Sequence, residues 1–403
     1  MADSDERPVV LAVSSEMPWP LTSGGHLRTF HLLRSIAKRF RVHLLVPALS
    51  GDTEGTSALA REGIRAEAVP TTARGPLVDA LNASRCAASG RAYVMYGRHV
   101  HESVRRRARE VIADLSPAVL YLDHLDGFGY GLRPERSVVA LDLHNVYSLI
   151  AERLAQEQSG LRRAYLRREA RLLKRAERSA AAGVDVLFAV SRQEVAYYET
   201  LGGPNVHLVP NGVDCAAYAS LPDGRVRGDL IVYVGSMSWP PNEEAALFLA
   251  TTVLPQVRRQ RPNARLRIVG KSPGAELRAL DGRDGIEVTG EVPDVIPHLE
   301  EAALLAVALE SGGGTRLKIL EALAAGLPVV STPVGAEGLD LEAGVHLVIE
   351  ERARFADAIT GVLTDRATGT RIARSGRALV RRVYDWSAIG ASAADALSAA
   401  VRG

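Results

Sequence analysis

The 403-residue sequence predicts an α/β protein with two doubly wound parallel sheets. Short runs rich in Val, Leu and Ile recur along the chain, and helical patterns separate them. Each run is apolar nearly throughout, which is typical of parallel strands that helices cover on both faces. A polar stretch rich in Pro and Gly interrupts the series once, and a second series of the same kind follows, which predicts two domains.

Length and composition agree with this division. A chain of 403 residues exceeds one ordinary hydrophobic core, and its 47% hydrophobic and 24% charged residues are typical of a globular protein. The 49 Lys and Arg against 47 Asp and Glu leave a formal charge of +2, which excludes a global attraction to nucleic acid or to anionic membranes. Nucleic acid is therefore not an expected partner, and any membrane contact would have to be local.

The sequence shows no targeting or redox signal. The N-terminus, MADSDERPVV, lacks the basic-then-apolar run of a signal peptide, and no apolar stretch reaches the roughly 18 to 20 residues that span a bilayer. Cys86 and Cys215 are the two cysteines, and neither belongs to a CxxC or a Cys/His cluster. A disulfide framework and a structural zinc site are therefore not expected. These features predict a cytoplasmic protein.

The first series of apolar runs predicts a domain over residues 1–220. Helical patterns at 26–40 and 103–115 lie between runs of this series. The polar stretch at 219–229 has no periodicity and is typical of a linker. The runs themselves cover residues 8–15, 41–47, 118–123, 137–144, 184–191 and 206–212.

The second series predicts a domain over residues 228–383. Each of its runs ends in glycine or small polar residues before a helical pattern; the runs cover 230–236, 264–270, 286–292, 302–309, 328–335 and 345–350. In doubly wound sheets, ligands bind beyond the carboxyl ends of the strands. Two such sheets therefore predict two domains that face each other across a ligand-binding cleft.

The segment 310–339, ESGGGTRLKILEALAAGLPVVSTPVGAEGL, is the most informative part of the sequence. It predicts a helix that Thr315 caps and that Gly326 ends, just before Pro328. The face expected to pack on the sheet follows the i, i+3, i+6, i+7 spacing and consists of Leu317, Leu320, Leu323 and Ala324.

The start of this helix has the features of an anion site. Glycines let backbone N–H groups approach a ligand closely, and a helix N-terminus favours phosphate. Arg316 and Lys318 would add full positive charge, although cations are disfavoured at a helix N-terminus unless an anion binds there. Alternatively, the segment is a glycine turn with a solvated basic end and a surface pair between Lys318 and Glu321.

Other loops follow strand ends in the same way. The loop 332–338 could close on the same ligand, and the loop that starts at Gly235 precedes a helix for which Asn242 is a candidate cap. In the first domain Gly24 and Gly25 precede an amphipathic helix.

His144 lies at the carboxyl end of the run 137–144 and hence at the predicted cleft. It is one of few side chains there that could exchange a proton near neutral pH. A histidine in a loop is otherwise a structural or solvated residue, and the residues alone leave both interpretations open.

The stretch 161–179 predicts a strongly basic helix, with eight Arg or Lys against two Glu. Leu161, Tyr165, Leu172 and Ala176 lie roughly on one side of it. Such a helix would suit a weak peripheral contact with an anionic membrane, at the inner face for a cytoplasmic protein. The alternative is an ordinary domain helix with a basic solvent face, because the apolar side is thin.

Several motifs occur together in the order and spacing of a known group. They are VPNGVD (209–214), GSMSWPPNEEA (235–245), VGKSP (269–273), VTGEVPDV (288–295), the block 312–339 and YDW (384–386). On these motifs the chain resembles the retaining glycosyltransferases of family 4 (GT4), in a branch that shares the pattern GTRxKILEA. The first half matches mainly through SGGHLR and DLHNV.

The resemblance implies the GT-B fold and a division of labour between the domains. The second domain would hold a nucleoside diphosphate sugar, and the first would hold an acceptor hydroxyl of a glycan, a lipid or a natural product. The last helix, about 384–403, would pack back onto the first domain. Transfer would retain the anomeric configuration and would need no metal and no cofactor beyond the nucleotide sugar itself.

The resemblance also implies roles for individual residues. Glu321 matches the glutamate that binds the ribose hydroxyls, and its carboxylate suits two adjacent hydroxyl donors. Gly24 and Gly25 match the loop that closes over the diphosphate, His144 matches the histidine beside the donor sugar, and Thr289 to Val292 resemble the base-binding turn. Together with the charges at the start of the helix, the predicted catalytic residues are His144, Lys318 and Arg316. The predicted donor-binding residues are Gly24, Gly25, Gly235, Lys271, Thr289, Glu291, Val292, Glu310, Gly313, Gly314, Thr315 and Glu321.

Two departures from the family pattern stand out. Many members carry an acidic residue where this chain has Gly313, and Glu310 is the candidate that replaces it. Many members also carry an Arg and a Lys in the first loop of the second domain, and GSMSWPPNEEA has neither. Arg316, Lys318 and Lys271 are the candidates that replace these cations.

Other functions on the same fold stay open at this point. A sugar phosphorylase, or a hydrolase or epimerase of nucleotide sugars, would share the phosphate site. A non-catalytic partner subunit would share the fold; Gly313 in place of the acid supports it, whereas Glu321, Lys318 and His144 speak against it.

Overall fold

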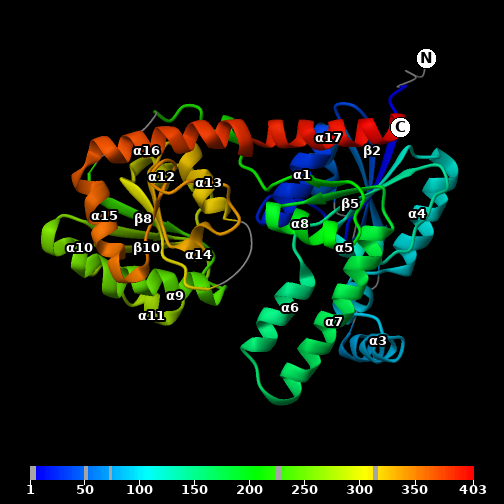
Figure 1. The fold of residues 1–403 in the computed structure, drawn as a ribbon, viewed down its shortest axis with the longest axis horizontal. Helices are drawn as coiled ribbons and strands as arrows, with labels where there is room; N and C mark the ends of the chain where they lie inside the picture. The colour runs from blue at the N-terminus through cyan, green and yellow to red at the C-terminus, as the bar shows by residue number, and fades with distance from the viewer. Residues whose placement is uncertain (1–5, 50–52, 72–74, 223–227, 312–315) are drawn as a thin grey trace. The chain divides into compact units, whose positions relative to one another are not determined.

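The computed structural model describes residues 6–49, 53–71, 75–222, 228–311 and 316–403. The chain forms two compact units (Figure 1). Unit 1 runs to Asn211 and also includes Ile389–Gly403, and unit 2 is Gly212–Ala388. The boundary between the units follows Asn211 and so lies upstream of the 219–229 stretch.

Unit 1 contains a seven-stranded parallel sheet with the strand order β3-β2-β1-β4-β5-β6-β7. Strand β1 pairs with β2 on one side and β4 on the other, so that Val10 lies between Val42 and Val119. The strands are β1 (Val9–Val13), β2 (Arg41–Ala48), β3 (Ile64–Pro70), β4 (Val119–Asp123), β5 (Val138–Asp142), β6 (Val186–Ala189) and β7 (Val206–Leu208).

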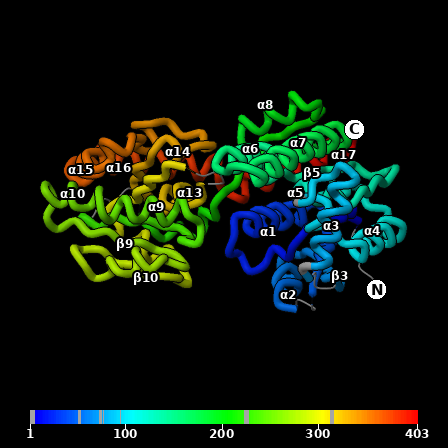
Figure 2. Tube along the Cα trace, turned by 90° about the horizontal axis from the view of Figure 1, so that it is seen from below, coloured from blue at the N-terminus to red at the C-terminus, as the bar shows by residue number. Residues whose placement is uncertain are grey.

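Helices connect and cover these strands. They are α1 (Gly24–Ile36), α2 (Thr53–Arg61), α3 (Pro76–Ala88), α4 (Glu102–Leu115), α5 (His124–Phe128), α6 (Tyr147–Gln156), α7 (Gly160–Ala182) and α8 (Arg192–Thr200), with a further helical turn at Tyr93–Arg98. Helices α6 and α7 run side by side as a pair (Figures 1 and 2). The core between sheet and helices is apolar, and its strand residues Leu11, Leu120, Leu141 and Leu187 are fully buried.

Unit 2 contains a six-stranded parallel sheet with the order β10-β9-β8-β11-β12-β13. The strands are β8 (Leu230–Val234), β9 (Arg265–Val269), β10 (Ile286–Gly290), β11 (Leu304–Val307), β12 (Val329–Ser331) and β13 (Val348–Ile349). The helices are α9 (Pro240–Phe248), α10 (Leu254–Gln260), α11 (Ala275–Arg278), α12 (Ile296–Glu301), α13 (Leu317–Ala324), α14 (Pro333–Ala336), α15 (Phe355–Thr364) and α16 (Arg366–Leu379). Shorter helical turns cover Cys215–Tyr218, Leu249–Val253, Arg352–Arg354 and Val380–Tyr384.

The last helix, α17 (Trp386–Arg402), begins among the residues of unit 2 and continues in those of unit 1. Within unit 1 it packs closely on α1, because a side chain at Gly390 would collide with Ser35. Arg39 also forms an ion pair with Asp395.

Each of the twelve apolar runs contains one strand, so the predicted α/β class with two doubly wound parallel sheets is confirmed. The strand that the runs missed is β3, at the edge of the first sheet, where polar side chains such as Arg65 and Glu67 interrupt the apolar pattern. No helix of the described ranges is long and apolar enough to cross a membrane.

Candidate functional site

The carboxyl ends of three neighbouring strands of unit 2 meet closely through glycines. The N–H of Gly235, after β8, donates to Val269 O (2.9 Å), and the N–H of Gly270, after β9, donates to Gly290 O (3.0 Å). Gly270 has a φ of +147°, and a Cβ on it would lie 1.8 Å from Gly235 O. Because only glycine allows this approach, the loops after β8 and β9 lie against each other at the edge where doubly wound sheets bind ligands.

Lys318, in the first turn of α13, reaches into the loop after β8. Its Nζ donates to Asn242 Oδ1 (2.9 Å) and to Tyr233 Oη (3.2 Å), and it lies 4.4 Å from the centroid of the Tyr233 ring. A Cβ on Gly235 would stand 2.9 Å from this ammonium group. Lys318 therefore brings a positive charge to a loop whose own residues, 235–239, include no Lys or Arg.

The surroundings of Lys318 do not neutralise its charge well. Both of its hydrogen-bond acceptors are uncharged, and the side chain is half-buried. Burial, together with the charge of Arg316, lowers the pKa of Lys318 to about 7, although Glu321 partly opposes this shift. A bound anion would restore the charged form, so the position suits a phosphate group.

Asn242 does not cap α9, although the sequence made it a candidate for that position. Trp239 occupies the cap position and Pro240 begins the helix, where a proline fits because its missing N–H has no partner in the first turn. The Asn242 side chain is instead buried: its Oδ1 accepts from Lys318 and from Tyr233 Oη (2.9 Å), and its Nδ2 donates to Ser236 O (2.9 Å). Asn242 thus fixes Lys318 and the loop relative to each other.

Glu321 lies one turn further along α13 and is half-buried. Among the residues that the structure describes, none donates a hydrogen bond to its carboxylate. Burial raises the pKa of Glu321, an effect that Lys318 opposes and Asp294 strengthens. A half-buried carboxylate of this kind is suited to accept hydrogen bonds from ligand hydroxyls.

Arg316 occupies the cap position of α13, with a φ of −87° and a ψ of 48°, so the helix begins at Leu317. The predicted cap, Thr315, lies outside the described residues. The Arg316 side chain is only 3% exposed; its Nη2 donates to Val334 O (2.8 Å) and lies 3.8 Å from Glu337 Oε2. Arg316 therefore holds the loop 332–338 against the start of α13.

The buried face of α13 differs from the one that the i, i+3, i+6, i+7 spacing predicts. Leu320, Leu323 and Ala324 are buried as predicted, but Leu317 is half-buried, and Ile319 is fully buried as well. The helix ends as expected, because Gly326 adopts a φ of +73°, a conformation that glycine accepts without strain.

The remaining predicted residues of unit 2 differ in their surroundings. Glu310 is exposed and forms an ion pair with Arg352 (3.0 Å), a guanidinium that also binds Glu244. Lys271 and Glu291 are exposed, Val292 is half-buried, and Thr289 Oγ1 donates to Gly290 O (2.9 Å). Gly313 and Gly314, like Thr315, lie outside the described residues.

In unit 1, the predicted glycine loop is the first turn of α1. The helix begins at Gly24, two residues earlier than the predicted 26–40, because Ser23 caps it: Ser23 Oγ accepts from the N–H of His26 (3.1 Å). Gly24 and Gly25 therefore carry N–H groups of the first turn, which a helix leaves without intrahelical acceptors.

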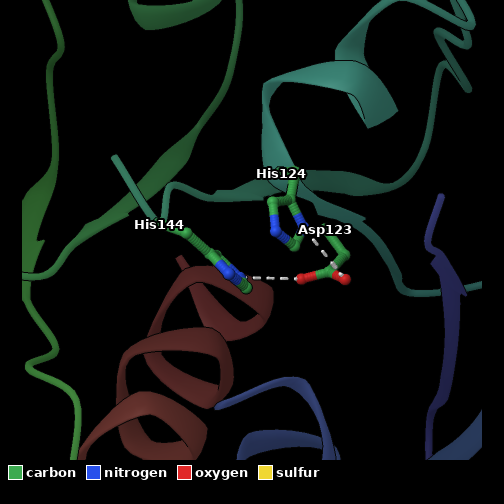
Figure 3. A group of neighbouring side chains, drawn as sticks. All are labelled: Asp123, His124 and His144. Carbon is green, nitrogen blue, oxygen red and sulfur yellow. Dashed lines mark hydrogen bonds and ion pairs between the residues drawn. The ribbon is translucent and has the colours of Figure 1, made fainter. Parts of the chain in front are cut away.

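His144 belongs to a cluster with His124 and Asp123 (Figure 3). The two imidazole rings lie 3.5 Å apart, centroid to centroid, with an interplanar angle of 36°. His144 Nε2 lies 3.0 Å from Asp123 Oδ1, and His124 Nδ1 lies 3.3 Å from Asp123 Oδ2. Asp123 also accepts hydrogen bonds from Ser14 and Thr29.

A second buried carboxylate, Asp142, stabilises the same cluster. It binds the fully buried guanidinium of Arg28 and lies 3.3 Å from His144 Nε2. Burial alone would lower the pKa of His144, but Asp123 and Asp142 outweigh it and raise the pKa to about 9. At neutral pH His144 is therefore a cation and a hydrogen-bond donor.

Asp123, His124 and His144 are also the three metal-capable side chains of the described residues whose ligand atoms lie within 4.8 Å of one another. Their arrangement suits charge pairing better than metal binding. His144 Nε2 already lies between two carboxylates, and Asp123 also accepts hydrogen bonds from Ser14 and Thr29.

Sequence reasoning missed several of these residues. Asp123 and His124 form an Asp-His pair at the end of β4, next to the strand whose end carries Asp142 and His144. Adjacent parallel strands place such ends side by side, so this repeated signal was available. Tyr233 gave no such signal, because an apolar strand with one tyrosine resembles any core strand.

Comparison with family models places both units in known groups. Residues 22–217 match the model described as Glycosyltransferase Family 4, and residues 228–365 match the model described as Glycosyl transferases group 1.

Two curated relatives from Mycobacterium tuberculosis are similar to part of the chain. A glycogen synthase is 27% identical over 214 residues, which cover 50% of this chain and 50% of the relative. A GDP-mannose-dependent alpha-(1-6)-phosphatidylinositol monomannoside mannosyltransferase is 31% identical over 246 residues, which cover 53% of this chain and 62% of the relative. The chain thus spans about half to three fifths of the curated relatives it matches.

Solved structures share the fold over nearly the whole chain. A sucrose-phosphate synthase from Thermosynechococcus elongatus has a TM-score of 0.68 at 17% identity and covers 98% of this chain and 99% of its own. Anabaena HepE in complex with UDP and glucose has a TM-score of 0.61 at 16% identity, and the match covers 98% of this chain and 100% of the HepE chain. These likenesses show a GT-B fold, and the two family models together span most of the sequence. The chain belongs to the family 4 glycosyltransferases.

Proposed function

We propose that the chain is a retaining, metal-independent glycosyltransferase that moves a sugar from a nucleoside diphosphate sugar to an acceptor hydroxyl. The proposal rests on Lys318, a half-buried cation with a pKa lowered to about 7, whose two hydrogen-bond acceptors among the described residues are uncharged. It lies at the carboxyl ends of the unit 2 strands, where doubly wound sheets bind nucleotides.

In this proposal Lys318 binds the diphosphate and stabilises the charge that builds on it as it leaves. A fixed cation aimed at developing charge needs no reorganisation at the moment of reaction. Arg316 acts indirectly, because its guanidinium is buried against Val334. It adds positive potential at Lys318 and holds the loop 332–338 in place.

Glu321 is proposed to bind the ribose hydroxyls, and the turn from Thr289 to Val292 is proposed to contact the base. The Glu321 carboxylate is engaged by none of the described side chains, so its oxygens can accept two hydroxyl donors. Base recognition by backbone groups would explain why the sequence does not specify which nucleotide binds.

In unit 1, His144 and the N–H groups of Gly24 and Gly25 are proposed to orient the donor sugar and its leaving group. The buried carboxylates near His144 are Asp123 and Asp142, and cations or donors bind both. Neither is placed as an enzymic nucleophile. Retention would then follow if the acceptor hydroxyl attacks from the side of the departing phosphate, which takes its proton.

The test incubates the protein with a panel of UDP-, GDP-, dTDP- and ADP-sugars, with and without candidate acceptors, and follows the released nucleotide. Release that depends on the acceptor, with an NMR-verified product of retained configuration and full activity in a chelator, supports the proposal. Equal release without acceptor indicates a hydrolase or an epimerase, and dependence on inorganic phosphate indicates a phosphorylase. No release and no nucleotide binding indicate a non-catalytic partner subunit.

We also propose that α7 gives the chain a weak peripheral contact with an anionic membrane surface. Its eight Arg and Lys side chains are exposed or half-buried, whereas both of its glutamates, Glu169 and Glu177, are buried. The solvent face of the helix is therefore purely cationic. Each cation near an anionic surface contributes about 1 kcal/mol.

Exposed apolar side chains lie where α6 ends and α7 begins. Leu161 is 91% exposed, Tyr165 is 48% exposed, and Leu154 on α6 is 46% exposed. Further along α7, Leu172 and Ala176 are buried, so only the first part of the predicted apolar side faces solvent. The contact would thus use the junction of α6 and α7.

Sedimentation with vesicles tests this contact. The protein should sediment with phosphatidylglycerol-containing vesicles at low salt and not with phosphatidylcholine vesicles. The triple variant Arg162→Gln, Arg163→Gln and Arg167→Gln should lose this binding, whereas a control with the exposed Arg259, Arg374 and Arg382 changed to Gln should keep it. Equal binding by both triple variants would contradict the contact.

A further inference from the structure

His124 has an uncommon backbone conformation. It begins α5 with a φ of +61°, in the left-handed region that is uncommon for residues other than glycine, although Asn, Asp and His adopt it more often than most. Its side chain is 14% exposed, against 5% for His144 and 1% for Asp123. The left-handed conformation thus occurs at a residue whose side chain lies against a buried acid and remains partly accessible.

The surrounding charges assign the protons of both rings. Asp123 Oδ2 lies 3.3 Å from His124 Nδ1, and a carboxylate beside that nitrogen favours the tautomer with the proton on Nδ1, in which Nε2 is an acceptor. The carboxylates of Asp123 and Asp142 surround His144 Nε2 and favour the imidazolium, so its Nδ1 carries a donor N–H.

The two remaining nitrogens face the same place. A Cβ built on Gly25, in the first turn of α1, would lie 3.8 Å from His124 Nε2 and 3.8 Å from His144 Nδ1. Beside Gly25, therefore, one acceptor nitrogen and one donor N–H are within reach of a single small group. Glycine at position 25 leaves this space open.

We propose that His124 and His144 together bind one hydroxyl group of a substrate, which donates to His124 Nε2 and accepts from His144 Nδ1. A hydroxyl is the group that offers one donor and acceptor lone pairs on one atom, so it matches both nitrogens at once. This inference rests on the proposed glycosyl transfer. It assigns His124, which the resemblance does not mark, a direct contact with either the sugar of the donor or the acceptor.

The chain offers a matched pair of substitutions at this position. In His124→Gln the amide reaches the place of Nε2 and keeps an acceptor there. In His124→Asn the amide reaches only the place of Nδ1, so it keeps a polar group beside Asp123 and loses the acceptor at Nε2. Asn also tolerates a positive φ better than Gln, so it is the better replacement if the role is structural.

The experiment measures kcat and KM for donor and acceptor in wild type, both variants and the control His207→Gln, with thermal unfolding recorded for each. We expect His124→Asn to lower kcat/KM about tenfold, the size expected for a lost hydrogen bond, while its unfolding temperature equals or exceeds that of His124→Gln. His124→Gln and the control should stay within about threefold of wild type on the same scale. Gly25→Ala, which fills the space with only van der Waals contacts, should lower kcat/KM without unfolding the protein.

The outcomes separate the possible failures. A wild type that transfers no sugar overturns the proposed function and this inference together. An active wild type with His124→Asn as active as His124→Gln overturns the inference alone. Where Asn is impaired and Gln is not, hydrolysis of the donor without acceptor tells the source of the hydroxyl: a parallel loss assigns it to the donor sugar, and unchanged hydrolysis with a raised acceptor KM assigns it to the acceptor.

Discussion

Lys318 Nζ lies 2.9 Å from Asn242 Oδ1, so the first turn of α13 and the first turn of α9 are joined by one hydrogen bond. Through this contact, a cation of the segment after β11 lies at the loop after β8. Many family members are expected to carry the cation in that loop itself, where this chain has Ser236, Met237 and Ser238. Lys318 reaches the same loop from the first turn of α13.

Replacement of Lys318 by Ala should lower kcat about 10²-fold or more, because the lost cation would act on charge that forms only in the transition state. Steady-state kinetics with the donor found in the panel measures the effect. The exposed Lys38→Ala is the control and should leave kcat unchanged. Full activity of the Lys318 variant would exclude its role.

Gly235→Ala tests the position of the ammonium group. The new Cβ would stand 2.9 Å from Lys318 Nζ and 3.0 Å from the Asn242 amide, so the end of the lysine side chain must move. Affinity for the nucleoside diphosphate should fall about tenfold or more, with a smaller effect on the unfolding temperature. In the same unit Gly361→Ala adds a Cβ that meets nothing within 4 Å and should leave affinity unchanged. Equal affinities of the two variants would contradict the assigned position.

Diphosphate affinity should depend on pH above 7. The pKa of Lys318 is lowered to about 7, so the unliganded protein loses this charge as pH rises through 7, and binding must then return the proton. The dissociation constant should therefore rise between pH 7 and 9, by at most about tenfold per pH unit for one proton. Arg316 and Glu321 are the charged groups that face Lys318, and the arginine stays charged throughout this window.

Calorimetric titration from pH 6 to 9 measures this dependence. Lys318→Arg keeps a charge at every pH used and provides the comparison. Its dissociation constant should change little with pH, even if its value differs from that of wild type. The same slope in both proteins would show that another group is responsible.

The free energy of unfolding should depend on pH through the charge of His144. Its pKa is raised to about 9 in the folded protein, against about 6.5 in an unfolded chain. The stabilisation from the charged ring is therefore complete below pH 6.5 and is lost as pH rises through 9. Denaturant unfolding of wild type and His144→Gln should give free energies of unfolding whose difference shrinks from pH 6.5 to 9.5. A constant difference would mean that His144 is not charged in the folded protein.

The sequence predicted most of the fold because the strands are buried on both faces. Apolar runs such as 118–123 and 328–335 each contain a strand, since only sheets covered by helices need uninterrupted apolar residues. The strand β3 escaped prediction because it lies at the edge of its sheet, where Glu67 faces Arg107 and His43 instead of a core.

The candidate site was predicted less completely. Residues of one segment, such as Lys318 and Glu321 on α13, could be placed together from their spacing alone. The hydrogen-bond acceptors of Lys318 belong to Tyr233 and Asn242. These residues are more than 75 positions away in the sequence, and no local pattern links them to Lys318. The raised pKa of His144 likewise arises from Asp123 and Asp142, whose approach depends on the pairing of β4 with β5.

The most direct test of the central claim, that a nucleoside diphosphate binds unit 2 at the start of α13, is the titration of UDP, GDP, dTDP and ADP into wild type, Lys318→Ala and Glu321→Ala. The account predicts that at least one nucleotide binds wild type and that both substitutions weaken it about tenfold or more, the amount that one lost charged hydrogen bond explains. Binding of the same nucleotide with equal affinity to all three proteins, or no binding to wild type at all, would contradict it.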